Sequence, residues 1–316
     1  MDTYTLALKA LSALKLGQGY AWPEMESLFK RAASSQPRDW QLPQLACEAV
    51  GGELEQAAPA IAAIACAQIS IILIDDLLDA DPRGEHQTLG LPAAANLAAA
   101  FQAAALEVIS AKEGIDDPAA KQAAWRSLNQ MMLTTAFGQY LDIQNPADEA
   151  AYWKVVETKS APFYGAAFHI GALVGDASIE IAEQLKQLGA LYGEIIQIHD
   201  DMNDVMAKPA NPDWMLGRSP LPILFAQSVD YPERDKFLQL RRVLQSVPDP
   251  EALAEAQLIL IRCGAISYSL YELTRRHSAA QEMLNGLALC RRTGLELLFE
   301  DLIEPVKKLL STTAVA

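Results

Sequence analysis

Cysteine is scarce in this sequence, and the spacing of the few cysteines excludes two kinds of site. The 316 residues contain four cysteines that lie far apart, without a CxxC pair or a Cys/His metal spacing. A disulfide framework and a structural zinc site are therefore not expected. The amino-terminal segment also lacks a basic head and a cleavage site, so we expect no signal peptide. The sequence thus predicts a cytoplasmic protein with reduced core cysteines, namely Cys47, Cys66, Cys263 and Cys290.

Positive charge is also in short supply. The chain has 25 lysines and arginines against 40 aspartates and glutamates, which gives a net charge of −15. An excess of negative charge repels phosphate backbones and anionic lipid headgroups. The composition therefore argues against nucleic acid and against an anionic membrane surface as partners.

Strand signals are rare, because few β-branched runs alternate with polar residues. Alanine, leucine, glutamate and glutamine recur instead at helical spacing. The chain is 51% hydrophobic, which suffices for a large core, and no segment has the composition of a flexible linker. We therefore predict one all-α domain over residues 1–316, in which ten or more helices form a bundle around a central apolar cavity.

One apolar segment is long enough to suggest a membrane span. Residues 57–74 are interrupted only by Pro59 and Gln68. The segment is rich in alanine, however, and it lacks the basic flanks and aromatic anchors that spanning helices carry. A buried central helix without stable membrane insertion is the favoured interpretation.

The same apolar run ends in a cluster of carboxylates. Residues 61–81 read IAAIACAQISIILIDDLLDAD, with Asp75, Asp76, Asp79 and Asp81 at the end. Asp75 and Asp79 are four residues apart and share one face of a helix, where like charges repel. A hard divalent cation such as Mg²⁺ would relieve this repulsion. The alternative is a solvated acidic helix end in an acidic protein.

A second copy of the pattern favours the metal interpretation. Residues 189–206 read GALYGEIIQIHDDMNDVM and place Asp200, Asp201 and Asp204 in another DDxxD motif, 125 residues after the first. If the two helices faced each other, six carboxylates would hold several Mg²⁺ ions and, through them, a polyphosphate. Apolar side chains below the carboxylates would accept a hydrocarbon. The combination is typical of a site for an isoprenoid diphosphate.

With these two motifs in place, the chain resembles the all-trans isoprenyl diphosphate synthases. The resemblance runs through most of the chain and includes ACEAVGG (residues 46–52), GQYLD (138–142), YWKVVETKSA (152–161), the QxxDD arrangement that begins at Gln197, and GRSPLP (217–222). Two DDxxD motifs with these segments between and after them form a specific signal. The resemblance implies the helical trans-prenyltransferase fold, shared with class I terpenoid synthases, and a homodimer.

The resemblance also implies roles for individual residues. Three Mg²⁺ ions would be held against an allylic prenyl diphosphate by six aspartates: Asp75, Asp76, Asp79, Asp200, Asp201 and Asp204. The cations Arg83, Lys159, Lys208 and Arg218 would bind the diphosphate. Gln197, Thr158 and Lys159 would stabilise the allylic cation, since developing charge is stabilised by preoriented dipoles. Gln68, Ser70 and Ile71 would line the pocket, and the small Ser70 suggests room for a long substrate.

Three departures from the family pattern affect the acceptor half of the site. The basic loop that usually grips isopentenyl diphosphate is replaced by SQPRDW (residues 35–40), in which Arg38 is a partial substitute. A histidine commonly found seven residues before the first aspartate is Gln68. The paired arginines after the first motif are reduced to Arg83. A diphosphate needs cationic partners, so we expect weak binding of isopentenyl diphosphate.

Three functions remain open on this sequence. The first is an Mg²⁺-dependent prenyltransferase that couples the allylic group to isopentenyl diphosphate or to another nucleophile. The second is a terpene synthase on the same scaffold, which needs no second diphosphate. The third is a non-catalytic subunit of a heteromeric synthase, against which the two intact motifs argue. Other basic residues (Arg275, Arg276, Arg291 and Arg292) are expected on solvated helix faces.

Overall fold

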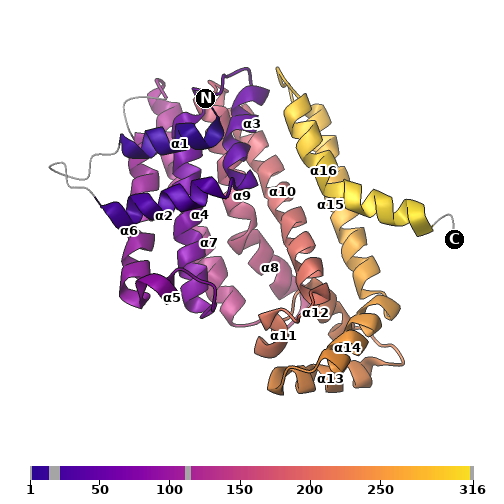
Figure 1. Ribbon diagram of the computed structural model, residues 1–316. Helices are drawn as coiled ribbons and strands as arrows, with labels where there is room; N and C mark the ends of the chain where they lie inside the picture. Colours follow the sequence, from indigo (N-terminus) through magenta and orange to yellow (C-terminus); the bar gives the residue numbers. More distant parts are fainter. Residues whose placement is uncertain (1, 14–21, 111–114, 314–316) are drawn as a thin grey trace. The chain divides into compact units, whose positions relative to one another are not determined.

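The computed structural model is a helical protein (Figure 1), and it describes residues 2–13, 22–110 and 115–313. Within these ranges the chain forms sixteen α-helices and one short 3₁₀ helix, without a β-strand. The prediction of an all-α protein is therefore confirmed. Of the amino-terminal segment in which no signal peptide is expected, residues 1 and 14–17 lie outside the described residues.

The helices divide between two compact units, each of which gathers several separate stretches of the chain. Unit 1 comprises Met1–Ala136, Pro162–Ala190 and Leu284–Leu298. The elements that lie wholly or mainly in it are α1 (Thr3–Ser12), α2 (Pro23–Ser34), η2 (Arg38–Gln41), α3 (Leu42–Ala49), α4 (Ala58–Leu78), α5 (His86–Leu89), α6 (Leu91–Ser110), α7 (Pro118–Ile143) and α9 (Ala161–Val174).

Unit 2 comprises Phe137–Ala161, Leu191–Met283 and Phe299–Ala316. It contains the end of α7 and, from Leu191 onward, the second half of α10 (Ile179–Met206). Its other elements are α8 (Glu149–Lys159), α11 (Pro212–Leu216), α12 (Leu221–Ser228), α13 (Arg234–Ser246), α14 (Pro250–Arg262), most of α15 (Ala265–Gly286) and most of α16 (Thr293–Thr313). Helix α10 (Ile179–Met206) begins in unit 1, so α7, α10, α15 and α16 supply residues to both units. The single-domain prediction stays a prediction.

Helix α4 is the buried centre of unit 1. Its residues from Ala60 to Ala67 are fully buried, because the helix packs along α6 and against α1 and α3. Alanine at most of these positions allows the close approach of the neighbouring helices. The carboxyl-terminal part is more open, and Ile72 and Ile74 are exposed. Burial of α4 supports the interpretation of residues 57–74 as a central helix.

By length and composition, two helices could nevertheless cross a membrane. These are α4 and α6, and the pair α14 and α15, which is bent by 55°, passes the same test when taken together. In the tested windows of α4 and α6, 56% and 44% of the residues are buried inside the protein. The absence of stable membrane insertion stays a prediction, supported by this burial.

The prediction that all four cysteines are core residues is wrong in part. Cys47 and Cys66 are buried, but Cys263 is half-buried and Cys290 is exposed in the connection between α15 and α16. Cys290 lies between two helices rather than on a buried helix face, and its segment is attached through the backbone, where the N–H of Cys290 donates to the carbonyl of Ala49. Within the described residues, none of the four is paired in a disulfide.

Candidate active site

The first aspartate motif closes helix α4. Asp75 and Asp76 stand in its last turn, and Asp79 caps its carboxyl terminus with the N–H donating to the carbonyl of Asp75. Burial raises the pKa of Asp76, and the neighbouring carboxylates of Asp81 and Asp75 raise it further. The negative charges in this motif therefore oppose one another, and a bound cation would relieve the repulsion.

Arg83 follows the motif and is tied to it through Asp81. Its backbone N–H and guanidinium donate to the carboxylate of Asp81, at distances of 2.7–3.1 Å. The side-chain bond to Arg83 is the main reason why the pKa of Asp81 lies below its ordinary value. The Arg83 side chain is 82% exposed, so its guanidinium also faces solvent. Its predicted role in binding the diphosphate is compatible with this exposure.

Gln68 belongs to an internal hydrogen-bond chain in unit 1. The indole N–H of Trp40 donates to Oε1 of Gln68 at 2.7 Å, and Nε2 of Gln68 donates to Asp39 at 2.5 Å. Trp40 is fully buried, and burial raises the pKa of Asp39. The Gln68 amide, at the position where the resemblance expects a histidine, therefore links α4 to η2 through partners within the chain. Arg38, at the start of η2, is exposed.

The two other predicted pocket residues lie on the same helix, just before the motif. Ser70 is 3% exposed, and Ile71 is half-buried. Since α4 packs along α6, Ser70 belongs to the tightly packed part of unit 1. The proposal that Ser70 sets the length of the substrate stays a prediction.

The second aspartate motif closes helix α10, and its three aspartates have different environments. Asp200 is exposed, Asp204 is half-buried and Asp201 is 5% exposed. Three donors reach the buried carboxylate of Asp201: the hydroxyl of Tyr152 at 2.8 Å, Nε2 of Gln197 at 2.8 Å and the backbone N–H of Leu221 at 2.7 Å. Burial raises the pKa of Asp201 to about 6, although these hydrogen bonds oppose the shift. Asp201 thus joins α8, α10 and the start of α12.

The predicted catalytic residues Gln197 and Thr158 lie near the junction of α8 and α9. Besides donating to Asp201, Gln197 accepts a hydrogen bond at Oε1 from the hydroxyl of Ser160, at 2.5 Å. The hydroxyl of Thr158 points back into its own helix and donates to the carbonyl of Lys154 at 2.6 Å. Because this hydroxyl is buried and engaged, Thr158 could serve a substrate only through its backbone.

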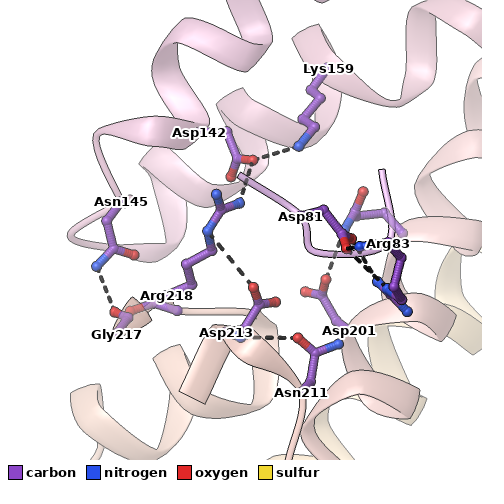
Figure 2. A network of polar contacts seen from close by, with 12 residues as sticks. Asp81, Arg83, Asp142, Asn145, Lys159, Asp201, Asn211, Asp213, Gly217 and Arg218 are labelled. Carbon is purple, nitrogen blue, oxygen red and sulfur yellow. Dashed lines mark hydrogen bonds and ion pairs between the residues drawn. The ribbon is translucent and has the colours of Figure 1, made fainter. Parts of the chain in front are cut away.

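Lys159 and Arg218 flank one carboxylate (Figure 2). Nζ of Lys159 lies 2.6 Å from Oδ2 of Asp142, and Nη1 of Arg218 lies 3.4 Å from the same oxygen. Nε of Arg218 also lies 3.8 Å from Asp213. Both cationic side chains are 22% exposed, so solvent reaches them. Two of the four predicted diphosphate-binding cations are therefore brought together. Lys208 is exposed and outside this network, within the part of unit 2 that the structure describes.

A glycine allows the close approach that positions Lys159. A Cβ atom at Gly138, near the end of α7, would overlap the backbone of Thr158 and Lys159. Glycine is therefore required there for α7 to reach the end of α8. Helix α8 is also fixed at its start, because the side chain of Asp148 caps it through the N–H of Ala151. The GQYLD motif thus supplies both the contact surface and Asp142.

The loop that carries Arg218 is held from α13. The buried guanidinium of Arg241 donates to the carbonyls of Gly217 and Arg218, at 2.5 and 2.7 Å, and to the hydroxyl of Ser219 at 3.1 Å. Nδ2 of Asn145 donates to the same Gly217 carbonyl at 2.8 Å (Figure 2). Burial lowers the pKa of Arg241 to about 10, which leaves it charged at neutral pH. The loop is therefore held at its backbone while the Arg218 side chain faces Asp142.

Sequence reasoning gave no role to three of these residues. Tyr152 and Asp142 lie inside the YWKVVETKSA and GQYLD segments, so the motifs contained the signal without saying which side chains matter. Arg241 belongs to a charged amphipathic helix and carried no signal. Its importance comes from burial, which only the tertiary structure determines.

The expectation of solvated arginines on the last helices is wrong for Arg276. It is 7% exposed, its guanidinium lies 3.6 Å from the ring centroid of Trp153, and it pairs with Glu194 at 2.6 Å and with Glu272. Arg292 donates to three carbonyls near the end of α15. Arg276 is buried because α8, α10 and α15 each place one of its partners around it.

Comparison with known proteins identifies the family. The family model described as polyprenyl synthetase matches residues 41–257, more than two thirds of the chain. The chain belongs to the polyprenyl synthetase family. Among its relatives, the geranylgeranyl diphosphate synthase of Methanosarcina mazei is 29% identical over 272 residues, which cover 81% of each chain. The short chain isoprenyl diphosphate synthase of Methanothermobacter thermautotrophicus is 29% identical over 71% of this chain and 72% of its own.

Solved structures show the same fold. The geranylgeranyl pyrophosphate synthetase of Geoglobus acetivorans matches with a TM-score of 0.74 and 22% identity, over 96% of both chains. A decaprenyl diphosphate synthase from Rhodobacter capsulatus matches with a TM-score of 0.80 and 16% identity, also over 96% of both chains. The family member described here thus has the helical trans-prenyltransferase fold, and it is a prenyltransferase of isoprenoid biosynthesis.

Proposed function

We propose that this enzyme uses Mg²⁺ to ionise an allylic prenyl diphosphate and transfers the prenyl group to isopentenyl diphosphate, which it binds weakly. The observation that carries the proposal is the pairing of Lys159 and Arg218 around Asp142 in unit 2, in the same unit as the second aspartate motif. Cations beside metal-binding carboxylates are the groups that a diphosphate requires. The names of the relatives support the acceptor.

The aspartates fit Mg²⁺ to different degrees. Within the described residues, no group of three or more acidic, cysteine or histidine side chains is preassembled for a metal ion. The mutual repulsion in the first motif favours a bound cation, and Asp200 and Asp204 are accessible. Both oxygens of Asp201 already accept hydrogen bonds from the protein. We infer that Asp75, Asp76, Asp79, Asp200 and Asp204 hold Mg²⁺, while Asp201 orders the segments around it.

The bound ions would supply Lewis-acid neutralisation of the leaving diphosphate. The chain's own residues then divide the remaining work. Lys159 and Arg218, together with Arg83 and Lys208, hold the diphosphate oxygens. Gln197, which is fixed between Ser160 and Asp201, presents its amide dipole to the cation. Near Thr158 the backbone supplies a further dipole.

The hydrogen-bond chain Trp40–Gln68–Asp39 supports weak binding of isopentenyl diphosphate. It leaves an acidic group and a neutral amide at positions where the resemblance expects diphosphate-binding cations. Each charge-assisted hydrogen bond contributes roughly 1.5–3 kcal/mol, so losing two or three weakens binding by about a thousandfold or more. A terpene synthase, the second candidate, is favoured by the same observation because it needs no second diphosphate.

Binding of the acceptor can be measured by titrating isopentenyl diphosphate into the protein with Mg²⁺ and an unreactive allylic analogue. We expect a dissociation constant in the millimolar range, and tighter binding by Asp39→Asn, which removes a carboxylate but can still accept from Gln68. Micromolar binding by the unchanged protein would contradict the assignment of this half of the site.

The two motifs can be tested separately by Asp75→Ala and Asp200→Ala. Each should reduce release of diphosphate from the allylic substrate at least ~100-fold, the scale of losing a strong electrostatic contact. Asp230→Ala, at an exposed aspartate after α12, is the matched control and should keep full activity. Near-full activity of either motif variant would refute the requirement for both motifs.

The remaining proposals concern the setting of the enzyme. We retain three proposals: the homodimer implied by the resemblance, a cytoplasmic location without membrane insertion, and a single domain over residues 1–316. Burial of α4 and α6 inside unit 1 supports the second of them.

A further inference from the structure

A cavity with both polar and apolar walls lies in unit 1, outside both aspartate motifs. It has a volume of about 320 Å³ and is formed by the first half of α7, by His169 on α9 and by the first turns of α10. Its size is at the lower end of the range for sites that hold small molecules. The prenyl transfer described above uses none of its residues.

Two polar groups in the cavity wall are buried without a hydrogen-bond partner among the described residues. His169 is 1% exposed, and neither of its ring nitrogens is hydrogen-bonded; the hydroxyl of Ser127, 4% exposed, is in the same situation. The carboxylate of Glu183 lies 3.3 Å from Nε2 of His169, but outside hydrogen-bond geometry. Buried polar groups in folded proteins are almost always satisfied, so the cavity must supply partners for them.

The charges around the cavity favour an anion. Arg126 lines it and has no ion pair or hydrogen bond in the described ranges, and Lys186 lies 3.6 Å from Glu183. Burial lowers the pKa of His169 to about 4, so the imidazole is neutral at pH 7. The charged groups of the cavity are therefore the Arg126 guanidinium, the Lys186 ammonium and the Glu183 carboxylate, with one positive charge in excess. This local excess contrasts with the net charge of −15 of the whole chain.

The arrangement of donors selects among anions. The cavity offers four kinds of hydrogen-bond donor: a guanidinium, an ammonium, a hydroxyl and an imidazole. These are more donors than the two oxygens of a carboxylate require, but they suit the three terminal oxygens of a phosphate. Ala119, Ala123 and Ile179 provide an apolar wall beside these groups. We propose that this cavity binds a small organic phosphate, with the phosphate on Arg126 and Lys186, its hydrogen bonds completed by Ser127 and His169, and its carbon atoms against the apolar wall.

The test follows the histidine side chains by NMR. The chain has only four histidines, so the imidazole nitrogens can be resolved, and His169→Gln assigns the signal of interest. Glycerol 3-phosphate is titrated into the full chain without Mg²⁺, with glycerol and inorganic phosphate as comparison probes. We expect a saturable shift of the His169 signals by glycerol 3-phosphate in the millimolar range or below, a weaker response to phosphate and none to glycerol.

Variants locate the binding. Arg126→Gln should weaken the binding of glycerol 3-phosphate about tenfold or more, since it removes a bidentate partner. Ser127→Ala should weaken it less. Lys121→Gln is the control, because it removes one positive charge from the same helix at a position that does not line the cavity. A His169 signal that does not move up to ~10 mM probe would overturn the proposal, as would equal binding by Arg126→Gln and the unchanged protein. Shifts confined to His199, beside the second aspartate motif, would also overturn it.

Discussion

Asp201 is the aspartate of the second motif whose carboxylate is engaged by the protein itself. Its buried carboxylate accepts hydrogen bonds from α8, from α10 and from the segment that starts α12. A buried carboxylate is costly unless donors surround it, and here each donor belongs to an element that carries a candidate site residue or lies next to one. The carboxylate of Asp201 therefore links α8, α10 and the start of α12 within unit 2.

Removing one donor should reveal this role. Tyr152→Phe takes away the hydroxyl that donates to Asp201, and we expect a loss of about 1–3 kcal/mol in the free energy of unfolding. Denaturant titration of the metal-free protein measures the loss. Tyr271→Phe, at a tyrosine that is 60% exposed, is the matched control and should be neutral. Equal stability of the two variants would show that Asp201 does not depend on Tyr152.

His169 should make the stability of the protein depend on pH. Its folded-state pKa of about 4 lies below the ordinary value of 6.5, because burial disfavours the charged ring. The unfolded chain therefore binds more protons between these values. The resulting stabilisation is complete above pH 6.5 and is lost as the pH falls towards 4. Of the charged groups facing the ring, Glu183 opposes the shift and Lys186 reinforces it.

The measurement compares the unchanged protein with His169→Gln. The free energy of unfolding of the unchanged protein should lose about 2 kcal/mol more than that of the variant when the pH is lowered from 7 to 5. The comparison with the variant is necessary because Asp201 changes the free energy of unfolding in the opposite direction. Its raised pKa of about 6 stabilises the folded protein as the pH falls through 6. Parallel pH profiles would contradict a buried neutral His169.

At the scale of elements, the loop between α11 and α12 is positioned through its backbone by the buried side chain of Arg241 and the exposed side chain of Asn145. Arg241 on α13 and Asn145 after α7 hold its carbonyls, and the N–H of Leu221 donates to Asp201. Arg218, which projects from this loop, is thereby kept beside Asp142. Fixing the backbone rather than the side chain leaves the guanidinium able to exchange Asp142 for a substrate oxygen.

Arg241→Gln should release this loop. We expect KM for the allylic diphosphate to rise by roughly tenfold to a hundredfold, since misplaced binding groups cost about that much, while kcat changes less. Arg242→Gln, at the exposed neighbouring position on α13, is the control and should leave both constants unchanged. Circular dichroism establishes that both variants are folded. An unaltered KM in folded Arg241→Gln would contradict the positioning role.

The elements themselves were largely predictable, whereas the contacts between them were not. The apolar run of α4 and the two aspartate clusters can be recognised from local sequence patterns. The structure places the two clusters at the ends of α4 and α10, as their spacing predicts. The roles of Arg241 and Arg276 depend on which helices surround them, and periodicity along one helix carries no such information. Gln68 is intermediate: its position was identified from the motif, but its bonds to Trp40 and Asp39 required the structure.

At the scale of the whole molecule, the chain forms two compact units that are interleaved in sequence. The first aspartate motif lies in unit 1, and the second lies in unit 2 with Lys159, Gln197 and Arg218. Because α7, α10, α15 and α16 contribute to both units, neither unit is a contiguous segment that could be removed from the chain. The polyprenyl synthetase match, residues 41–257, spans parts of both units and includes both aspartate motifs.

The most direct test of the central claim is to follow diphosphate release and product formation together. The protein is incubated with Mg²⁺ and geranyl, farnesyl or geranylgeranyl diphosphate, with and without radiolabelled isopentenyl diphosphate. The account predicts Mg²⁺-dependent diphosphate release that requires isopentenyl diphosphate, matches the incorporated label and saturates only at high acceptor concentration. Release of diphosphate without isopentenyl diphosphate, together with a hydrocarbon or alcohol product, would contradict prenyl transfer and identify a terpene synthase.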